Sequence, residues 1–324
     1  MARCLSFTGS ADFLYRSFFS YSGLRSVKTD LRDGTVMHCW VPKSLKPSRP
    51  NLVLVHGFGA NAMWQYGDLL RHLLPRFNIY VPDLVFFGES TTERADRSEA
   101  FQARCVMRLM EAHGVERMSV VGISYGGFVG YSMAAQFPGA VEQVVLCCTG
   151  VCLEQNDLKN GLFEVADLDE AASILMPQTP AKLRELMKFA FVRPVKAVPS
   201  CFLSDYIDMF GEDQKSDGRV FCTDHVAQKR ELIQALIKDR QLSKIPTIEQ
   251  PTLIIWGEQD RIFPLELGHR LKRHIGENAR LEIIKNAGHA MNIEKPREFA
   301  KLLKSFLVGS HSTRRPKMLF WGSP

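Results

Sequence analysis

The sequence lacks the signatures of several large classes of protein. Its eight cysteines are scattered, no Cys-x-x-Cys pair occurs, and no cluster of cysteine and histidine has the spacing of a zinc site. We also find no secretion signal, no internal repeat and no signature of nucleic-acid binding. We therefore expect a cytoplasmic protein with reduced thiols, no bound metal and no nucleic-acid partner.

The overall composition is that of an ordinary soluble protein. Hydrophobic residues make up 45% of the 324 residues, and charged residues make up 23%. A chain of this length is near the upper size for one hydrophobic core, so a core domain with an inserted cap is a natural organisation. The net charge of +6 permits weak attraction to anionic surfaces but does not identify a partner.

The most informative segment is Gly122-Ile123-Ser124-Tyr125-Gly126, which lies between a β-branched apolar run and a helix-compatible run of small residues. A strand, a sharp turn and a helix in this order form a nucleophile elbow, which carries the serine at its tip in a strained conformation. A side chain at either glycine would collide with neighbouring backbone as the chain reverses. We therefore predict that Ser124 is a nucleophile. If this motif stood alone, the alternative to a nucleophile elbow would be a glycine-rich turn that happens to contain a serine.

A second motif, His56-Gly57-Phe58-Gly59, follows the strand-like run Leu52–Val55. An oxyanion hole needs two convergent backbone N–H donors, one from the residue after the nucleophile and one from the loop after the third strand. Position in the sequence assigns these donors to Tyr125 and Phe58. His56 precedes the serine and sits at a strand end, so we interpret it as a residue that shapes the loop and not as a base.

Two further polar residues follow strands near the end of the chain. Asp260 comes after the run Thr252–Trp256, and His289 comes after the run Leu281–Ile284. The order serine, aspartate, histidine is the one expected beside a nucleophile elbow. His289 would accept the proton of Ser124 as general base, while Asp260 would fix the imidazole tautomer. Each could be an ordinary loop residue by itself, but their positions together favour a catalytic triad.

Strand-like runs alternate with helical segments along most of the chain. An Asp33-Gly34 turn joins the first two runs into a hairpin. The alternation predicts a mostly parallel central sheet flanked by helices, with the catalytic groups at the C-terminal ends of the strands. The expected strands are Arg25–Leu31, Thr35–Val41, Leu52–Val55, Ile79–Val81, Met118–Gly122, Val141–Leu146, Thr252–Trp256 and Leu281–Ile284.

The alternation stops after the sixth expected strand. Thr179-Pro180 is a typical helix start, and residues 225–239 have amphipathic helical spacing. We therefore expect a helical cap over residues 150–246, inserted in a core formed by residues 24–149 and 247–308. The apolar residues of the cap could line an acyl pocket, although each one taken singly could simply pack the cap on itself. The candidate substrate-binding residues are Phe86 near the opening and Phe189, Phe202 and Tyr206 in the cap.

Two terminal segments lie outside this core. Within residues 1–23, apolar and charged side chains follow helical spacing, which predicts a short amphipathic helix over residues 11–21. This helix either packs on the domain or makes weak contact with a membrane surface, and it is too polar to span a bilayer. Because this segment contains few acidic residues, a plastid transit peptide is a further interpretation. Residues 309–324 are expected to form a disordered tail.

The motifs together resemble those of the α/β-hydrolase superfamily. Within it, the chain is similar to the group of serine esterases, monoacylglycerol-lipase-like enzymes and carbon–carbon-bond hydrolases, over about residues 24–307. The segment from Pro82 to Ser90 resembles the corresponding segment in a plant-type branch of this group. Epoxide hydrolases and haloalkane dehalogenases share the fold but use an aspartate nucleophile, so Ser124 argues against both.

We therefore expect the α/β-hydrolase fold and a serine hydrolase that cleaves carboxylic esters through an acyl-enzyme intermediate. The expected partner is a small-molecule ester with a lipophilic acyl chain, such as a monoacylglycerol, and the chemistry needs no metal or organic cofactor. Two alternatives stay open. One is a carbon–carbon-bond hydrolase with the same triad, and the other is a non-catalytic receptor that uses the fold to bind a small ligand.

Overall fold

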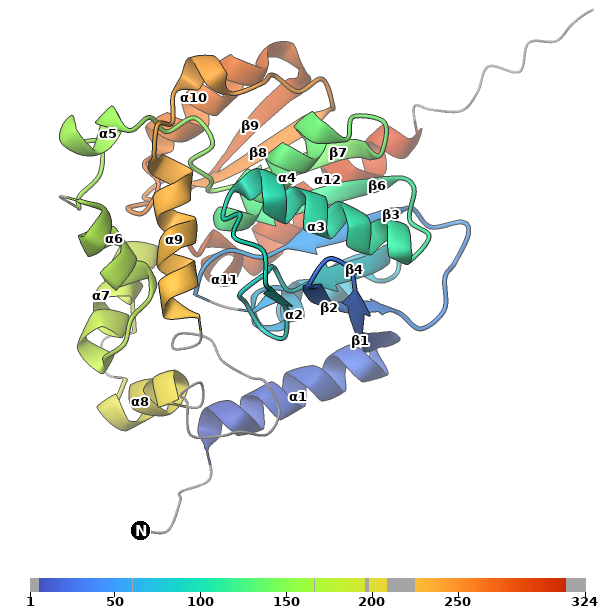
Figure 1. Ribbon diagram of the computed structural model, residues 1–324, viewed down its shortest axis with the longest axis horizontal. Helices are drawn as coiled ribbons and strands as arrows, with labels where there is room; N and C mark the ends of the chain where they lie inside the picture. The colour runs from blue at the N-terminus through green and yellow to red at the C-terminus, as the bar shows by residue number, and fades with distance from the viewer. Residues whose placement is uncertain (1–5, 60, 166, 196–197, 209–224, 313–324) are drawn as a thin grey trace, which may run out of the picture.

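The computed structural model describes residues 6–59, 61–165, 167–195, 198–208 and 225–312. These residues form one central sheet with helices on both faces and a group of helices along one side (Figure 1). The order of the main strands is β1-β2-β4-β3-β6-β7-β8-β9, and a short strand, β5, pairs with β2. The pairs that involve β2 are antiparallel, and all other pairs from β4 to β9 are parallel. The structure thus confirms the predicted mostly parallel sheet.

Every expected strand is present, with ends shifted by one or two residues. The strands are β1 (Leu24–Asp30), β2 (Thr35–Pro42), β3 (Asn51–Val55), β4 (Asn78–Pro82), β5 (Thr91–Thr92), β6 (Met118–Ile123), β7 (Val141–Cys147), β8 (Thr252–Gly257) and β9 (Ala279–Ile284). Strand β5 was not predicted, because two residues are too few to show an alternating pattern. The helical insertion therefore follows the seventh strand of the structure and not the sixth.

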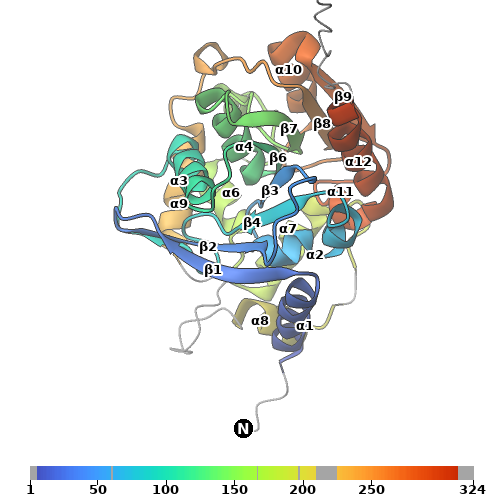
Figure 2. The same cartoon turned by 90° about the vertical axis from the view of Figure 1, so that its right-hand side faces the viewer.

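The helices of the core cover both faces of the sheet because its central strands are apolar throughout. Every residue of β6 and β8 is buried, which is typical of a parallel sheet covered on both sides. On one face α2 packs against α12, and on the other α3 packs against α4 (Figure 2). The core helices are α2 (Ala62–Leu73), α3 (Glu99–Ala112), α4 (Tyr125–Gln136), α10 (Leu265–Ile275), α11 (Met291–Glu294) and α12 (Pro296–Ser312), with short 3-10 turns at Leu242–Lys244 and Gly276–Asn278.

Between β7 and β8 the regular elements of the described residues are all helices. The helices of this insertion are α5 (Asn156–Lys159), α6 (Leu168–Leu175), α7 (Pro180–Ala190), α8 (Ser200–Asp208) and α9 (Val226–Ile237). Helix α7 begins where the sequence indicated, because the hydroxyl of Thr179 accepts a hydrogen bond from the amide of Lys182 and Pro180 occupies the first turn. We refer to this insertion as the cap.

The N-terminal helix α1 (Phe7–Tyr21) is longer than the predicted 11–21. It begins earlier because the Ser6 hydroxyl accepts a hydrogen bond from the Gly9 amide. In addition, Asp205 of the cap accepts hydrogen bonds from the amide and the hydroxyl of Thr8. No helix among the described residues is long and apolar enough to cross a membrane.

The expectation of a disordered C-terminal tail needs a correction. Helix α12 runs to Ser312, so residues 309–312 belong to a helix and not to a tail. The sequence did not indicate this extension, because the last buried apolar side chain described in the helix is Leu307 and the residues of the helix after 308 are polar or glycine. Residues 313–324 lie outside the described part of the chain.

Missing side chains allow the end of β3 and the start of α4 to lie in direct backbone contact. A Cβ atom at Gly126 would lie 2.1 Å from the carbonyl oxygen of Val55, and one at Gly122 would lie 2.2 Å from the carbonyl oxygen of Gly126. No real side chain fits at these distances, so both glycines are required by packing. Because these two glycines have no side chains, the loop after β3 can lie beside the serine.

We expect Gly126→Ala to lower the free energy of unfolding by more than about 2 kcal/mol, because the new methyl group must displace the backbone of β3. Urea unfolding followed by circular dichroism measures this. The matched control is Gly139→Ala, where no atom lies within 4 Å of the added methyl group. That variant should change stability by less than about 1 kcal/mol. Equal stability of the two variants would contradict the close approach.

Candidate active site

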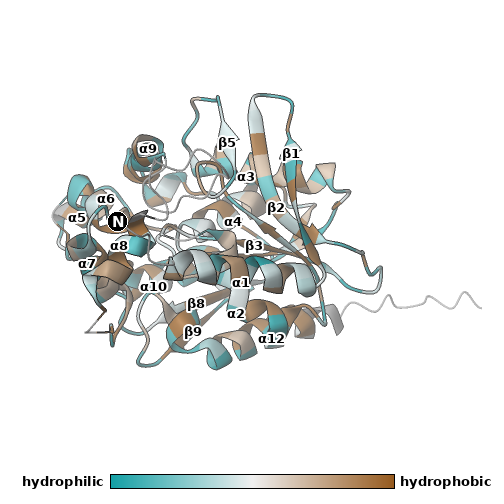
Figure 3. Cartoon of the chain, turned by 90° about the horizontal axis from the view of Figure 1, so that it is seen from below, coloured by the Kyte–Doolittle hydropathy of each residue, from teal (hydrophilic) through white to brown (hydrophobic). Residues whose placement is uncertain are grey.

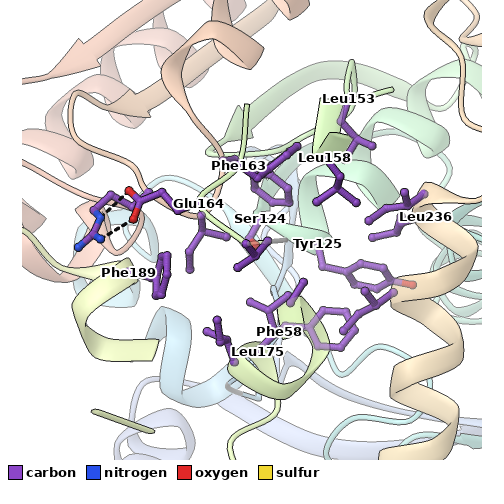
Figure 4. Close-up of a pocket in the computed structure, with 18 of the residues that line it drawn as sticks. Phe58, Ser124, Tyr125, Leu153, Leu158, Phe163, Glu164, Leu175, Phe189 and Leu236 are labelled. Atoms are coloured by element: carbon purple, nitrogen blue, oxygen red, sulfur yellow. Dashed lines mark hydrogen bonds and ion pairs between the residues drawn. The ribbon is translucent and has the colours of Figure 1, made fainter. Parts of the chain in front are cut away.

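Ser124 occupies the sharp turn between β6 and α4. Its backbone has φ 55° and ψ −120°, a conformation that a residue other than glycine rarely adopts. The turn is held because the Ser124 amide donates to the carbonyl oxygen of Cys147, 2.8 Å away, on the neighbouring strand β7. The side chain is largely buried but lies at the wall of a cavity under the cap (Figure 4).

Phe58 and Tyr125 border the same cavity from two different loops. Tyr125 is the first residue of α4, so its amide has no partner within the helix. Among the described residues, neither this amide nor that of Phe58 has a hydrogen-bond acceptor. The Phe58 loop approaches the serine closely, since a Cβ atom at Gly57 would lie 2.9 Å from Cβ of Ser124. The loop that carries one of these amides therefore lies close to the serine, and the other amide belongs to the residue that follows it.

Side chains hold the loop after β3 in place at both ends of Gly57. The Gly57 amide donates to Oε1 of Gln65 at 2.7 Å, and its carbonyl oxygen is bonded to Nδ1 of His56 at 2.8 Å. The amide of Leu84 donates to Nε2 of His56, so Nδ1 carries the proton. Burial lowers the pKa of His56 and keeps it neutral. His56 thus joins two loops. Gln65 helps to hold the loop after β3, a role that no sequence motif indicated.

The two residues that carry the unpaired amides also pack against each other. The rings of Phe58 and Tyr125 meet edge to face with centroids 4.9 Å apart, and Phe87 packs edge-on against Phe58 at 5.0 Å. Such pairs contribute about 0.5–1.5 kcal/mol beyond the burial of their area. This aromatic cluster therefore packs the loop after β3 against the start of α4.

Asp260 and His289 are brought together at the ends of β8 and β9. Nδ1 of His289 lies 2.8 Å from Oδ2 of Asp260, while Oδ1 accepts the amides of Ile262 and Phe263 at 2.9 Å each. A carboxylate at Nδ1 leaves Nε2 of the imidazole as the basic nitrogen. Within the described residues no hydrogen bond joins this imidazole to Ser124. Such contacts are often long in unliganded sites and tighten when substrate binds.

Phe263 links the imidazole to the cavity. Its ring packs against His289 with centroids 5.7 Å apart, and it lines the cavity together with Ser124. The loop of His289 is fixed separately, because Glu294 accepts the amide of Gly288 at 2.7 Å and that of Val192 at 3.0 Å. Glu294 therefore connects the end of α7 in the cap to the histidine loop.

Cys148 is a third neighbour of Asp260 that the sequence analysis did not assign to the site. It follows β7 with φ 44°, is fully buried, and its thiol lies close to the carboxylate. Burial raises the pKa of this thiol, which favours the neutral form. Sγ of Cys148 and the ligand atoms of Asp260 and His289 lie within 4.8 Å of one another. Because Asp260 already accepts bonds from the imidazole and two amides, we interpret the group as a hydrogen-bond network and not as a metal site.

The wall of the cavity is almost wholly apolar. Besides Ser124, its lining comes from both the core and the cap, and the only charged side chains among the described lining residues are Glu164 and Arg261. The apolar lining residues are Phe58, Phe128, Leu153, Leu158, Phe163, Val165, Ala171, Ile174, Leu175, Phe189, Ile233, Leu236, Ile237, Ile262 and Phe263. Glu164 and Arg261 form a two-point ion pair at the side of the cavity, and the guanidinium lies 5.0 Å from the ring centre of Phe189 (Figure 4).

Of the four candidate substrate-binding residues, Phe189 lies in the described lining of this cavity and the other three do not. Phe86 is buried elsewhere, with the guanidinium of Arg97 4.6 Å from its ring centre. Phe202 is exposed on α8, and Tyr206 donates its hydroxyl to the carbonyl oxygen of Gly59 at 3.0 Å. The assignments of Phe86, Phe202 and Tyr206 were based on residue type, which does not indicate the direction of a side chain.

Curated proteins similar to this chain include the monoacylglycerol lipase ABHD6 of Bos taurus, which is 26% identical over 295 residues. The alignment covers 87% of this chain and 82% of that protein. The monoacylglycerol lipase ABHD6 of Homo sapiens is 25% identical over 291 residues, covering 87% of this chain and 82% of that protein.

Among solved structures, a putative lipase from Acinetobacter baumannii AYE superposes with a TM-score of 0.77 at 21% identity, covering 94% of this chain and 97% of that one. This likeness shows that the two chains share a fold. A membrane phospholipase A described as a bacterial virulence factor superposes with a TM-score of 0.72 at 25% identity, covering 94% of this chain and 91% of that one.

A family model described as alpha/beta hydrolase fold matches residues 50–296. The match begins beside β3 and ends at the start of α12, so it includes the serine turn, the loop of Phe58 and the loops of Asp260 and His289. It spans most of the chain, and the sheet order and parallel pairing agree with it. The chain therefore belongs to the α/β-hydrolase fold family.

Proposed function

We propose that this protein is a serine hydrolase that cleaves carboxylic esters of lipophilic acids, such as monoacylglycerols, through an acyl-enzyme intermediate. One observation carries the proposal. The strained Ser124 lines one apolar cavity with Phe58 and Tyr125, whose backbone amides have no acceptor among the described residues. This combination suits attack on an acyl carbon, which needs a nucleophile, donors for the developing negative charge and a site for the acyl chain.

The first half of the reaction transfers the acyl group to the enzyme. Oγ of Ser124 attacks the ester carbonyl carbon, and Nε2 of His289 takes the hydroxyl proton. The amides of Phe58 and Tyr125 donate to the oxyanion of the tetrahedral intermediate. As this intermediate collapses, the imidazolium gives its proton to the departing alcohol. Asp260 keeps the proton on Nδ1 and stabilises the imidazolium charge.

The second half releases the acid. Water attacks the acyl carbon, His289 takes its proton, and the second tetrahedral intermediate expels Oγ of Ser124, which regains a proton from the imidazolium. The amides of Ile262 and Phe263 hold the Asp260 carboxylate towards the imidazole, and the Cys148 thiol lies close to it. The triad therefore stays aligned through both halves without a metal.

Two features support a lipophilic acyl chain as the substrate group. The cavity wall is apolar on both the core side and the cap side. Each methylene group buried in such a cavity contributes about 0.8 kcal/mol to binding. The relatives named as monoacylglycerol lipases, which align over more than four fifths of this chain, support the same class.

A carbon–carbon-bond hydrolase and a ligand receptor are the alternatives. A dienoate substrate of the first needs a cation for its carboxylate, but Arg261, the cation in the described cavity wall, is already paired with Glu164. A receptor needs no strained nucleophile between unpaired donors, so the arrangement around Ser124 favours turnover. The ester hydrolase is therefore the function that we propose.

The first test concerns the nucleophile. We expect a fluorophosphonate probe to label the protein at Ser124, and Ser124→Ala to abolish labelling and lower ester turnover by several orders of magnitude. Mass spectrometry of the labelled peptide and a p-nitrophenyl ester assay measure these effects. Persistent labelling of the Ser124→Ala variant would remove Ser124 from the mechanism.

The chain contains a matched control for this test. Oγ of Ser26 lies 2.8 Å from Nε2 of His38, whose Nδ1 lies 2.8 Å from Oδ2 of Asp83. This array repeats the serine, histidine and aspartate order, but Ser26 is exposed on β1 and is not in the described wall of the cavity. Ser26→Ala should leave both labelling and turnover unchanged, because a serine needs oxyanion donors and a cavity as well as a base.

The second test concerns the acid. Asp260→Asn keeps the shape of the side chain but favours the wrong imidazole tautomer, a change that costs about 10⁴ in rate in a well-studied serine protease. We expect a comparable loss of kcat with an unchanged thermal unfolding midpoint. Glu258→Gln is the control, because this exposed neighbour on the same loop bonds to the Asn286 amide and not to His289. Near-normal turnover by Asp260→Asn would exclude it as the triad acid.

The third test concerns the acyl chain. Ala171 on α6 lines the cavity, so Ala171→Phe should occupy part of it. In a series of p-nitrophenyl esters, kcat/KM of the wild type should rise about fourfold per methylene over a few carbons, and this rise should stop earlier in the variant. Ser173→Phe adds the same bulk to α6 at a position outside the described lining and should preserve the wild-type profile. Identical profiles of all three proteins would show that the cavity does not hold the acyl chain.

A further inference from the structure

Helix α1 exposes a continuous apolar face. Phe7, Phe13, Leu14 and Tyr21 are 67%, 68%, 66% and 92% exposed, and Phe18 is also exposed. With 3.6 residues per turn, these positions lie on one side of the helix, where serine residues separate them. We call this surface the α1 face. Figure 3 shows α1 on the side of the molecule nearest the viewer.

The charges of α1 have the opposite arrangement from that of an ordinary surface helix. Its two charged residues, Asp12 and Arg16, are directed to the protein. Asp12 is 2% exposed and accepts from the Trp64 indole, while Arg16 is bonded to Asp12 and reaches Glu89 of the core. A helix in contact with water on its outer side normally places charged residues there. The α1 face has none.

The helix is held rigidly beneath this face. The ring of Tyr15 fits against Gly67 of α2, where a Cβ atom would lie 2.5 Å from it. Asp205 of the cap holds the N-terminus through Thr8, and Phe202 of the cap packs edge-on against Phe7 with centroids 5.5 Å apart. The exposed side chains are therefore presented by a helix that is already folded and anchored, so their exposure does not come from a frayed end.

A basic depression adjoins the C-terminal end of α1. Its described lining contains Ser22 and Gly23 together with three cations, Lys43, Lys46 and Arg49, and no carboxylate. Lys43 and Arg49 donate to backbone carbonyl oxygens, those of Ser20 and Leu74. Within the described residues none of the three cations forms an ion pair with an acidic side chain. Their positive charge is therefore available to an anion from outside the chain.

From these observations we propose that the α1 face and the adjoining basic depression form a docking surface for an anionic phospholipid membrane. An uncharged aromatic face beside lysines that have no carboxylate partner among the described residues fits a helix that lies in the plane of a membrane interface. The face inserts among the acyl chains near the headgroups, and Lys43 and Lys46 contact lipid phosphate or carboxylate groups. The charge of the depression favours this occupant over a neutral apolar partner. Asp205 and Phe202 connect the docked helix to the cap.

The experiment is sedimentation of the full chain with vesicles of phosphatidylcholine, with and without phosphatidylserine. We expect the wild type to bind both and to bind the mixed vesicles more tightly. The double variant Phe13→Ser with Leu14→Ser should lose at least about tenfold in partition coefficient on both kinds of vesicle. The double variant Lys43→Gln with Lys46→Gln should lose about tenfold on mixed vesicles and little on phosphatidylcholine alone.

Two matched controls separate this surface from general effects. Val195→Ser with Ile293→Ser removes side chains that are 69% and 62% exposed elsewhere, and Lys301→Gln with Lys304→Gln removes the same charge from α12. Both should bind like the wild type, and all variants should keep the wild-type thermal unfolding midpoint. Absence of vesicle binding by the wild type, or equal binding by all variants, would overturn the proposal. A third outcome would also overturn it. If the wild type did not bind vesicles but formed a dimer in size-exclusion chromatography, and Phe13→Ser with Leu14→Ser abolished that dimer, a second copy of the chain would occupy the α1 face.

Discussion

The site depends on one backbone contact, the approach of the loop after β3 to the start of α4. Gly126 and Gly57 allow this contact, since a side chain at either position would overlap the backbone of the neighbouring segment. The contact brings Phe58 to the cavity wall that Ser124 and Tyr125 also line, and the amides of Phe58 and Tyr125 have no acceptor among the described residues. Parallel strands make such a meeting natural, because their C-terminal ends lie at one edge of the sheet.

The cap is joined to this edge by specific interactions and not only by apolar packing. Glu294 bonds to the end of α7 and to the histidine loop, and Arg261, next to Asp260 in the chain, pairs with Glu164 of the cap. An exposed ion pair such as the second contributes little to stability, so its effect lies in orienting the two segments. Displacement of the cap would therefore move the loops that carry Asp260 and His289. Asp205 extends the same connection to α1, which links the proposed membrane surface to the roof of the cavity.

Local patterns predicted the strands and the sharp turn at Ser124. They succeeded because each depends on neighbouring residues, as when β6 is a short apolar run that ends in a glycine-bearing turn. Patterns failed where orientation mattered. Phe202 and Tyr206 have the composition of a pocket, yet one faces solvent and the other bonds to Gly59. Cys148 was given no role in the sequence analysis, because no local signal shows that its thiol lies close to Asp260.

The sequence by itself determined the fold family, the elements and the residue types that can carry acyl transfer, because periodicity and turn chemistry are local properties. Only the tertiary structure decided which side chains converge. It placed Gln65 and Glu294 as supports of the two loops, chose Phe189 alone among the four candidate aromatics for the described cavity wall, and turned the charges of α1 inward. These outcomes depend on contacts between segments far apart in the chain, and the direction of a side chain across such a contact is set by packing, which no single segment encodes.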